Sequence, residues 1–165
     1  MTDLSINPAL ALRPVAAHDA TALAEFFRVI VANGDARFFS PHPLTGDGAA
    51  HVAAYRGRDV YTIAEEGGAI LAYGLLRGWD EGFVVPSLGI TTHPSVRGTG
   101  IGRLLMNYLH TVARRRGAPR VRLRVHRDNM NAVQLYRSMG YGFGDDTSEY
   151  LVGYLELTTG GQGAG

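Results

Sequence analysis

The sequence predicts a single-domain α/β protein in which a mixed sheet carries helices on both faces. Segments 84–126 and 120–146 each follow the order strand, helix, strand, which is typical of a sheet with crossover helices. A β-rich run on each side of the turn Glu66-Gly67-Gly68 adds a hairpin. The chain has 165 residues, of which 45% are hydrophobic and 19% charged, as in one soluble globular domain.

Composition excludes several classes of function. The formal net charge of +1 gives no electrostatic case for binding nucleic acid or an anionic membrane. Because the chain has no cysteine, disulfides, thiolate metal sites and a cysteine nucleophile are excluded, and we expect no metal. The sequence shows neither a signal peptide nor a run of ~20 apolar residues, so we expect a cytoplasmic protein. We expect residues 1–158 to form the domain and residues 159–165 a flexible tail.

The first third of the chain predicts a strand, a helix and a loop. Residues 10–15 form a short extended segment, and His18-Asp19 is the expected cap of the helix that follows. Asn33-Gly34 ends that helix. Its apolar residues recur at helical spacing: Leu23, Phe26, Phe27, Ile30 and Val31. Residues 38–48 are rich in proline and glycine and predict a loop, with a short helix near 48–56.

After the hairpin, residues 82–93 predict a strand in which Pro86 and Gly89 mark a bulge or a splayed edge. A long helix over 100–116 follows and ends at Gly117. Its expected apolar face consists of Ile101, Leu104, Leu105, Tyr108, Leu109 and Val112.

Residues 120–126 alternate strictly between apolar and basic side chains, as a strand does. Arg120, Arg122 and Arg124 share one face, which we expect to meet water or an anionic ligand. A helix begins after Asp128-Asn129 and ends at Gly140. Two last strands are expected near 141–146 and 149–157.

The stretch HPSVRGTGIG, residues 93–102, places a glycine loop between a strand and a helix. Such a loop presents backbone N–H groups at a helix N-terminus, where an anion binds favourably. Arg97 and Arg103 can add charge-assisted bonds, so a phosphate or pyrophosphate is the expected ligand. The spacing matches neither the dinucleotide-binding fingerprint nor the P-loop. A simple tight turn into the helix is the alternative interpretation.

Two motifs in this order resemble the GNAT superfamily of N-acetyltransferases. Arg97 to Gly102 matches the acyl-CoA loop pattern [Q/R]-x-x-G-x-[G/A]. Residues 129–141 match the later pattern N-x-x-A-x-x-L-Y-x-x-x-G-[F/Y]. The matching positions are Asn129, Ala132, Leu135, Tyr136, Gly140 and Tyr141. The resemblance covers residues ~12–145 in outline, and it implies a mostly antiparallel, splayed sheet.

The resemblance implies that acetyl-CoA lies between two splayed strands, 84–92 and 120–126, as the co-substrate. Its pyrophosphate would bind the amides of residues 98–103, its pantetheine arm would pair with residues 90–92, and an amide near Thr92 would polarise the thioester carbonyl. The implied cofactor-binding residues are Ile90, Thr91, Thr92, Arg97, Gly98, Thr99, Gly100, Ile101, Gly102, Arg103, Asn129 and Tyr136.

Tyr136 is the general acid that the resemblance implies, protonating the departing CoA thiolate; its helical stripe also fits a purely structural core role. Asn129 can both cap its helix and contact CoA. The general base is undecided, because the positions where many members carry a glutamate are here Pro86 and Arg124. The candidates are Glu81, Ser87 through a water, and His42; a water chain or an already neutral amine are alternatives.

The loop over 38–48 corresponds to the roof of the acceptor pocket, so Phe38, Phe39 and His42 are expected to contact substrate; the phenylalanines could instead anchor the loop. Arg122 and Arg124 could face an acidic acceptor or the phosphates of CoA. The expected activity is direct acetyl transfer to a primary amine of a small molecule or amino sugar. A peptide or protein N-acetyltransferase and a non-catalytic acyl-CoA-binding module are the alternatives. The resemblance also allows a homodimer.

Overall fold

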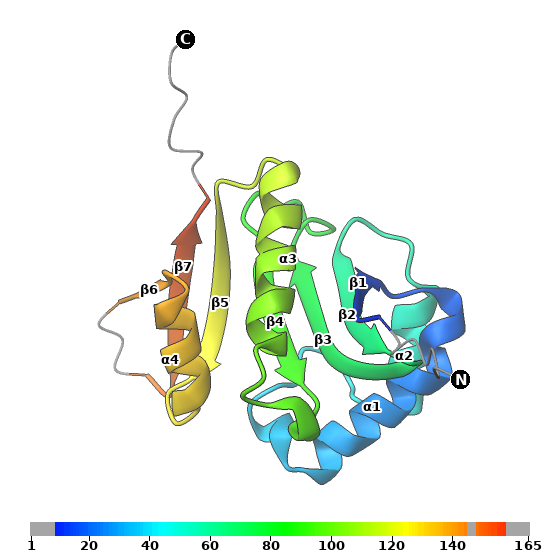
Figure 1. The fold of residues 1–165 in the computed structure, drawn as a ribbon. Coiled ribbons are helices and arrows are strands. Elements are labelled where there is room, and N and C mark those ends of the chain that lie inside the picture. The colour runs from blue at the N-terminus through cyan, green and yellow to red at the C-terminus, as the bar shows by residue number, and fades with distance from the viewer. Residues whose placement is uncertain (1–8, 145–147, 158–165) are drawn as a thin grey trace, which may run out of the picture.

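The computed structural model describes residues 9–144 and 148–157 (Figure 1). The strands are β1 (Ala11–Pro14), β2 (Val60–Glu66), β3 (Ala69–Arg77), β4 (Ser87–Thr92), β5 (Arg120–His126), β6 (Gly142–Phe143) and β7 (Tyr150–Glu156). The helices are α1 (Ala20–Ala32), α2 (Gly46–Ala54), α3 (Ile101–Arg115) and α4 (Met130–Ser138). Short 3₁₀ turns occupy Ala17–Asp19, Asp35–Arg37 and Pro94–Val96. The predicted tail, 159–165, and the end of the predicted strand near 141–146 lie outside the described residues.

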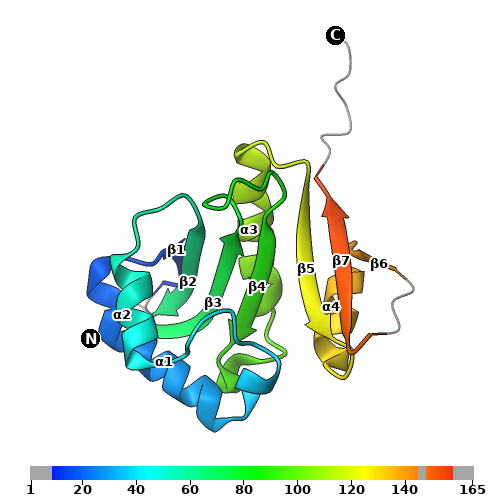
Figure 2. The same cartoon turned by 180° about the vertical axis from the view of Figure 1, so that it is seen from behind.

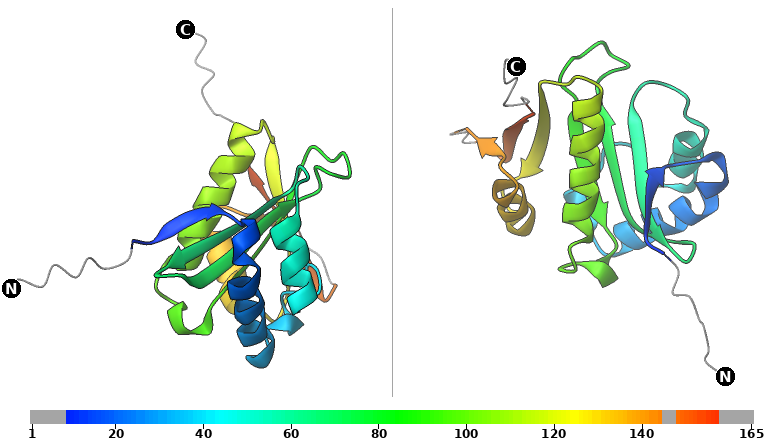
Figure 3. Two further views of the ribbon diagram at one scale, coloured as in Figure 1. Left: turned by 90° about the vertical axis from the view of Figure 1, so that its right-hand side faces the viewer. Right: turned by 45° about the horizontal axis from the view of Figure 1, so that its top comes forward.

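The seven strands form one sheet in the order β1-β2-β3-β4-β5-β7-β6. Every neighbouring pair is antiparallel except β4 and β5, which are parallel and joined through α3. Helices α3 and α4 lie on one face (Figure 1), and α1 and α2 cover the other (Figure 2). The views of Figure 3 show the same separation of α3 from α1 and α2. The predicted mixed, mostly antiparallel sheet with helices on both faces is therefore confirmed.

Each face of the sheet buries its own core. The α1 side holds Leu23, Phe27 and Ile30, packed against Tyr73 and Leu75 of β3. A second cluster joins the α3 side of β2–β4 to the inner face of β5, with Leu105, Leu109, Leu123 and Val125 among its members. Because β3 is covered on both faces, its side chains are nearly all buried, whereas the outer strand β1 is only partly buried.

Helix α3 packs with a different face from the one that its apolar residues predict. Leu104 is 41% exposed, whereas Met106 and His110 are fully or almost fully buried. The hydroxyl of Tyr141 lies 2.7 Å from His110 Nε2, and this partner makes a buried imidazole tolerable. Val31, expected on the apolar face of α1, is likewise exposed.

Of the two alternatives predicted for residues 82–93, a bulge or a splayed edge, the structure shows the splayed edge. Strand β4 begins only after Pro86, and its register with β3 runs unbroken past Gly89. The irregularity lies instead in β2, between Ala64 and Glu65. On its other edge β4 pairs with β5 through two residues alone, Ser87 and Leu88.

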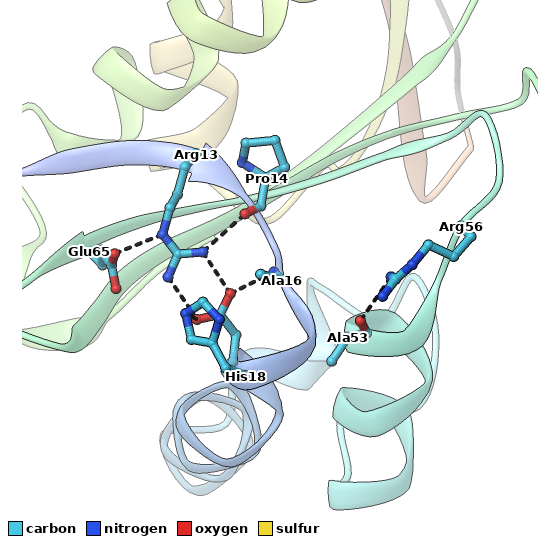
Figure 4. Close-up of polar contacts among 8 residues, drawn as sticks. Arg13, Pro14, Ala16, His18, Ala53, Arg56 and Glu65 are labelled. Carbon is cyan, nitrogen blue, oxygen red and sulfur yellow. Dashed lines mark hydrogen bonds and ion pairs between the residues drawn. The ribbon is translucent and has the colours of Figure 1, made fainter.

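The predicted cap of α1 is confirmed in position, because Asp19 is the N-cap residue, but its side chain does not bond to the helix. His18 and Asp19 both belong to the 3₁₀ turn before α1. The Asp19 carboxylate accepts two bonds of 2.7 Å from Arg13 and one of 2.6 Å from the Ala16 amide. Arg13 also reaches Glu65 at 2.8 Å, so the ion-pair group ties β1 to β2 and to the start of α1 (Figure 4).

Asp19→Asn is expected to destabilise the fold by ~1–3 kcal/mol at neutral pH, because a buried charge-assisted pair is lost. Hydrogen bonds from Arg13 hold the pKa of the Asp19 carboxyl below its usual range. The stabilisation is therefore present above the unfolded pKa of about 3.9 and is lost as the pH falls through the lower folded value. Urea unfolding at pH 7 and at acid pH measures both effects. In contrast, Glu25→Gln, at an exposed pair with Arg28, should leave the midpoint unchanged.

Candidate active site

A cleft opens where β4 and β5 separate beyond Leu88. It has a volume of about 660 Å³ and is lined from both faces of the sheet. Ile90 and Tyr136 line it from the α3–α4 side, whereas Phe39 and Gly89 line it from the α1 side. The cleft therefore passes between the two strands and connects the two faces of the sheet.

The glycine loop forms one wall of the cleft, at the N-terminus of α3. Gly98 and Gly100 have φ values of +77° and +90°, a conformation that side chains disfavour. The first helical hydrogen bond runs from the Leu104 amide to the Gly100 carbonyl, so the amides of residues 101–103 precede it. A Cβ on Gly102 would lie 3.4 Å from Thr92 Cγ2, which shows how closely α3 approaches β4. This loop has the geometry of an anion site.

The structure brings most of the predicted cofactor-binding residues together around the cleft. Those that line it are Ile90, Thr91, Thr92, Arg97, Gly98, Gly100, Gly102, Arg103, Asn129 and Tyr136. Thr99 and Ile101 are not among the lining residues. The Thr99 hydroxyl donates to the Val96 carbonyl, and Ile101 packs against the core. Asn129 stands at the N-cap position of α4, but its side chain makes no cap bond, in contrast to the expected role.

Arg97 is not a free cation. Its guanidinium donates to both carboxylate oxygens of Asp35, at 2.7 and 3.2 Å, and to the Thr92 carbonyl at 3.0 Å. Arg103 donates to the Ser138 hydroxyl at 2.8 Å. Asp35 is a cleft residue that sequence reasoning missed, because nothing local links it to Arg97. Because Asp35 compensates the Arg97 charge, the candidate anion-binding groups of the loop are mainly its backbone amides.

Residues 35–39, here called the crossing segment, contact both sides of the cleft. Asp35 holds Arg97 beside β4, while Arg37 lies 3.6 Å from Asp128 at the start of α4. The Phe38 ring lies 5.4 Å from the ring of His126 at the end of β5. Phe38 and Phe39 both line the cleft, as the prediction of a substrate contact requires. The segment passes across the α1 face of the sheet (Figure 2).

Tyr136 is buried between α4 and the cleft, with its side chain 8% exposed. Burial raises the pKa of its hydroxyl to about 12, so the group keeps its proton at neutral pH and can donate it. Its ring lies 5.9 Å from that of Tyr141. Tyr141 in turn contacts His110, and this buried row fixes the position of Tyr136.

The three base candidates lie away from the described lining of the cleft. His42 is engaged at both ring nitrogens, with the Tyr73 hydroxyl at 2.7 Å and the Pro43 carbonyl at 2.9 Å. Burial lowers its pKa, which favours the neutral imidazole. Ser87 lies where β4 and β5 meet and accepts from Arg122 at 3.3 Å. Glu81 is exposed in the turn before β4.

Comparison with known proteins identifies the class. The acetyltransferase (GNAT) family matches residues 31–141, about two thirds of the chain, and the chain belongs to this family. A streptothricin acetyltransferase from Streptomyces lavendulae is 37% identical over 73 residues. That match covers 44% of this chain and 38% of the Streptomyces enzyme, so the chain spans well under half of that relative's length.

Solved structures of the same fold cover nearly the whole chain. The PaiA N-acetyltransferase from Thermoplasma acidophilum, solved with coenzyme A, superposes with a TM-score of 0.73 at 15% identity, covering 90% of this chain and 99% of its own. YncA from Salmonella typhimurium, solved with acetyl-CoA, gives 0.73 at 19% identity, covering 90% and 94%. These similarities establish the fold.

Two further features bear on the class of protein. Among residues 9–144 and 148–157, no helix has the length and apolar character that crossing a bilayer requires. Within the same ranges, the acidic and histidine side chains form no cluster of three suited to a metal ion.

Because of His110, the protein is expected to become less stable as the pH is lowered. Burial lowers its pKa to about 4, whereas the unfolded value is about 6.5. Between these two pH values the unfolded chain binds a proton that the folded chain excludes, so the free energy of unfolding falls as the pH is lowered. His110→Gln, which cannot titrate, should reduce that slope by roughly 1 kcal/mol per pH unit. Parallel curves for the two proteins in urea unfolding from pH 4 to 7 would contradict this expectation.

Proposed function

We propose that the protein is an N-acetyltransferase that moves the acetyl group of acetyl-CoA directly to a primary amine of a small molecule or amino sugar. One observation carries the proposal: the glycine-loop amides and the buried Tyr136 hydroxyl border the same cleft. An anion site and a proton donor on one cleft are what acyl transfer from a diphosphate-bearing thioester needs.

The edge of β4 supports the assignment of acetyl-CoA. Beyond Leu88 the strand pairs with β3 alone, so the other backbone edge of residues 89–92 faces the cleft. An extended pantetheine arm can pair with such an edge as an added strand does. That PaiA and YncA were solved with coenzyme A and acetyl-CoA supports the same co-substrate here.

In the proposed reaction the neutral acceptor amine attacks the thioester carbonyl carbon, and the N–C bond forms as the C–S bond breaks. The amide near Thr92 stabilises the negative charge that develops on the carbonyl oxygen. Tyr136 gives its proton to the departing thiolate, which leaves as the thiol of CoA. The acceptor nitrogen loses a proton to water, or through a water chain to His42, Ser87 or Glu81, which lie outside the described lining of the cleft. The products are an amide and CoA.

The crossing segment favours a small acceptor over a peptide. Phe38 and Phe39 cover the cleft on the α1 side, and the contacts of the segment to Arg97 and Asp128 hold it there. A peptide or protein N-acetyltransferase needs an open groove at this place. A module that binds acyl-CoA without transferring it is the other alternative, and release of CoA across an amine panel distinguishes it. A cytoplasmic location, a homodimer and the absence of a metal stay predictions.

Gly100→Ala should weaken CoA binding ~10-fold or more, because a Cβ at φ +90° distorts the turn that presents the amides. Gly117→Ala is the matched control. Gly117 has φ +82°, has open space around it and lies at the far end of α3. Both variants should lose ~1 kcal/mol of stability, but only Gly100→Ala should lose affinity in calorimetric titration with CoA. Equal affinities in the two variants would remove the loop from the site.

Tyr136→Phe should lower kcat by about 100-fold, because the thiolate then leaves without a proton donor. The dissociation constant for acetyl-CoA should stay the same. Tyr108→Phe, on the partly buried flank of α3, should leave both quantities unchanged. Thiol release and calorimetry measure the two quantities. An unchanged kcat in Tyr136→Phe would reject this tyrosine as the acid.

A further inference from the structure

We infer that the acceptor carries an anionic group, a carboxylate or a phosphate, and that Arg124 of β5 binds it. This inference rests on the proposed function and specifies the class of its substrate. It follows from where the β5 arginines point, from what holds them and from which charges surround them.

The arginines of β5 lie on the acceptor side of the sheet. Val121, Leu123 and Val125 of this strand belong to the core under α3 and α4, so the alternating residues face the opposite side. Arg124 lines the cleft together with Gly89 and Phe39, which belong to that opposite side. The glycine loop lies on the α3 wall. Arg124 is therefore placed for the acceptor rather than for the phosphates of CoA.

Arg124 is held in position without using up its hydrogen-bonding groups. Its guanidinium carbon lies 3.7 Å from the centre of the Tyr150 ring. A guanidinium stacked on a ring keeps its N–H edges available, and those edges match a carboxylate or phosphate. Arg122 lies two residues earlier in β5, at the end where β4 and β5 pair. There it donates to Ser87 Oγ at 3.3 Å. Arg124 is therefore the β5 cation that lines the cleft, whereas Arg122, on the same face of β5, lies outside the described lining.

The positive charge at this end has no counter-ion in the described part of the chain. No described carboxylate lies within ion-pair distance of Arg122 or Arg124. Asp35 is the acidic residue of the described cleft lining, and Arg97 already holds it. By contrast, Arg120 on the same face lies 3.8 Å from Glu156 and over the Tyr154 ring. An acceptor with an added positive charge would be repelled here, whereas an anionic group would fill the site.

The first experiment measures thiol release with acetyl-CoA and matched pairs of amines. Each pair has an acidic member and its neutral counterpart: glutamate and glutamine, β-alanine and β-alaninamide, glucosamine 6-phosphate and glucosamine. The expected result is a kcat/KM at least ~10-fold higher for an acidic member than for its counterpart. The amino-acid pairs and the phosphate pair distinguish the two anions. Neutral members that match or exceed their acidic partners in every pair would overturn the inference while leaving the acetyltransferase proposal intact.

The second experiment compares Arg124→Gln with Arg120→Gln, a control on the same strand whose charge is already paired. Arg124→Gln should raise KM for the preferred acidic amine at least ~10-fold and leave KM for its neutral counterpart and the affinity for CoA unchanged. Arg120→Gln should change none of these. If Arg124→Gln weakened both amines equally, or weakened CoA binding, the role in acceptor recognition would be rejected.

A third measurement does not depend on turnover. The CoA-loaded protein is titrated calorimetrically with the acidic and neutral member of each pair, and the acidic member should bind more tightly in the wild type than in Arg124→Gln. Equal binding by both proteins would overturn the inference. Failure of CoA itself to bind would instead reject the proposed function, so the two failures are distinguishable.

Discussion

The separation of β4 from β5 after only two paired residues is the constraint on which the rest of the site depends. Two parallel strands that stayed paired would use each other's backbone N–H and C=O groups in hydrogen bonds and would leave no opening in the sheet. Because they part, the edge of residues 89–92 keeps its hydrogen-bonding groups, and the cleft reaches both faces. The α3 crossover that makes the pair parallel also places its own N-terminus beside the opening. The parallel β4–β5 crossover thus supplies the free edge of β4, the cleft through the sheet and the N-terminus of α3 together.

The cations around this opening fall into two groups with different consequences. Arg97 belongs to the glycine loop, yet Asp35 neutralises it, so backbone dipoles there provide most of the attraction for an anion. Arg124 is positioned by a tyrosine ring and has no carboxylate partner among the described residues. On the wall where a diphosphate is expected, Asp35 compensates Arg97, whereas Arg103 donates to the neutral Ser138 hydroxyl. At the end where the acceptor is expected, Arg124 has no carboxylate partner among the described residues, and its charge favours an acidic acceptor.

The sequence predicted the elements whose signals are local. Alternation in 120–126, the turn at Gly67-Gly68 and the glycine loop before α3 all appear in the structure where their patterns placed them. The features that the sequence did not show depend on side-chain partners, two of which lie far away along the chain. Asp19 stands at the N-cap position of α1 as predicted, but its oxygens accept from Arg13 and the Ala16 amide instead of from the helix. His110 was not among the residues predicted for the buried face of α3, and its partner Tyr141 lies 31 residues away. Asp35 and Arg97, 62 residues apart, could not be paired from the sequence for the same reason.

The crossing segment has a mechanical consequence. Residues 35–39 touch the β4 side through Arg97 and the β5 side through Asp128 and His126, so they act as a brace between two parts that share few ladder bonds. Spreading these parts would break side-chain contacts and leave nearly all backbone pairing intact. Since two of those contacts are ion pairs at the surface, ionic strength weakens the brace. We therefore expect the separation of the two parts to depend on surface electrostatics as well as on the few backbone bonds between β4 and β5.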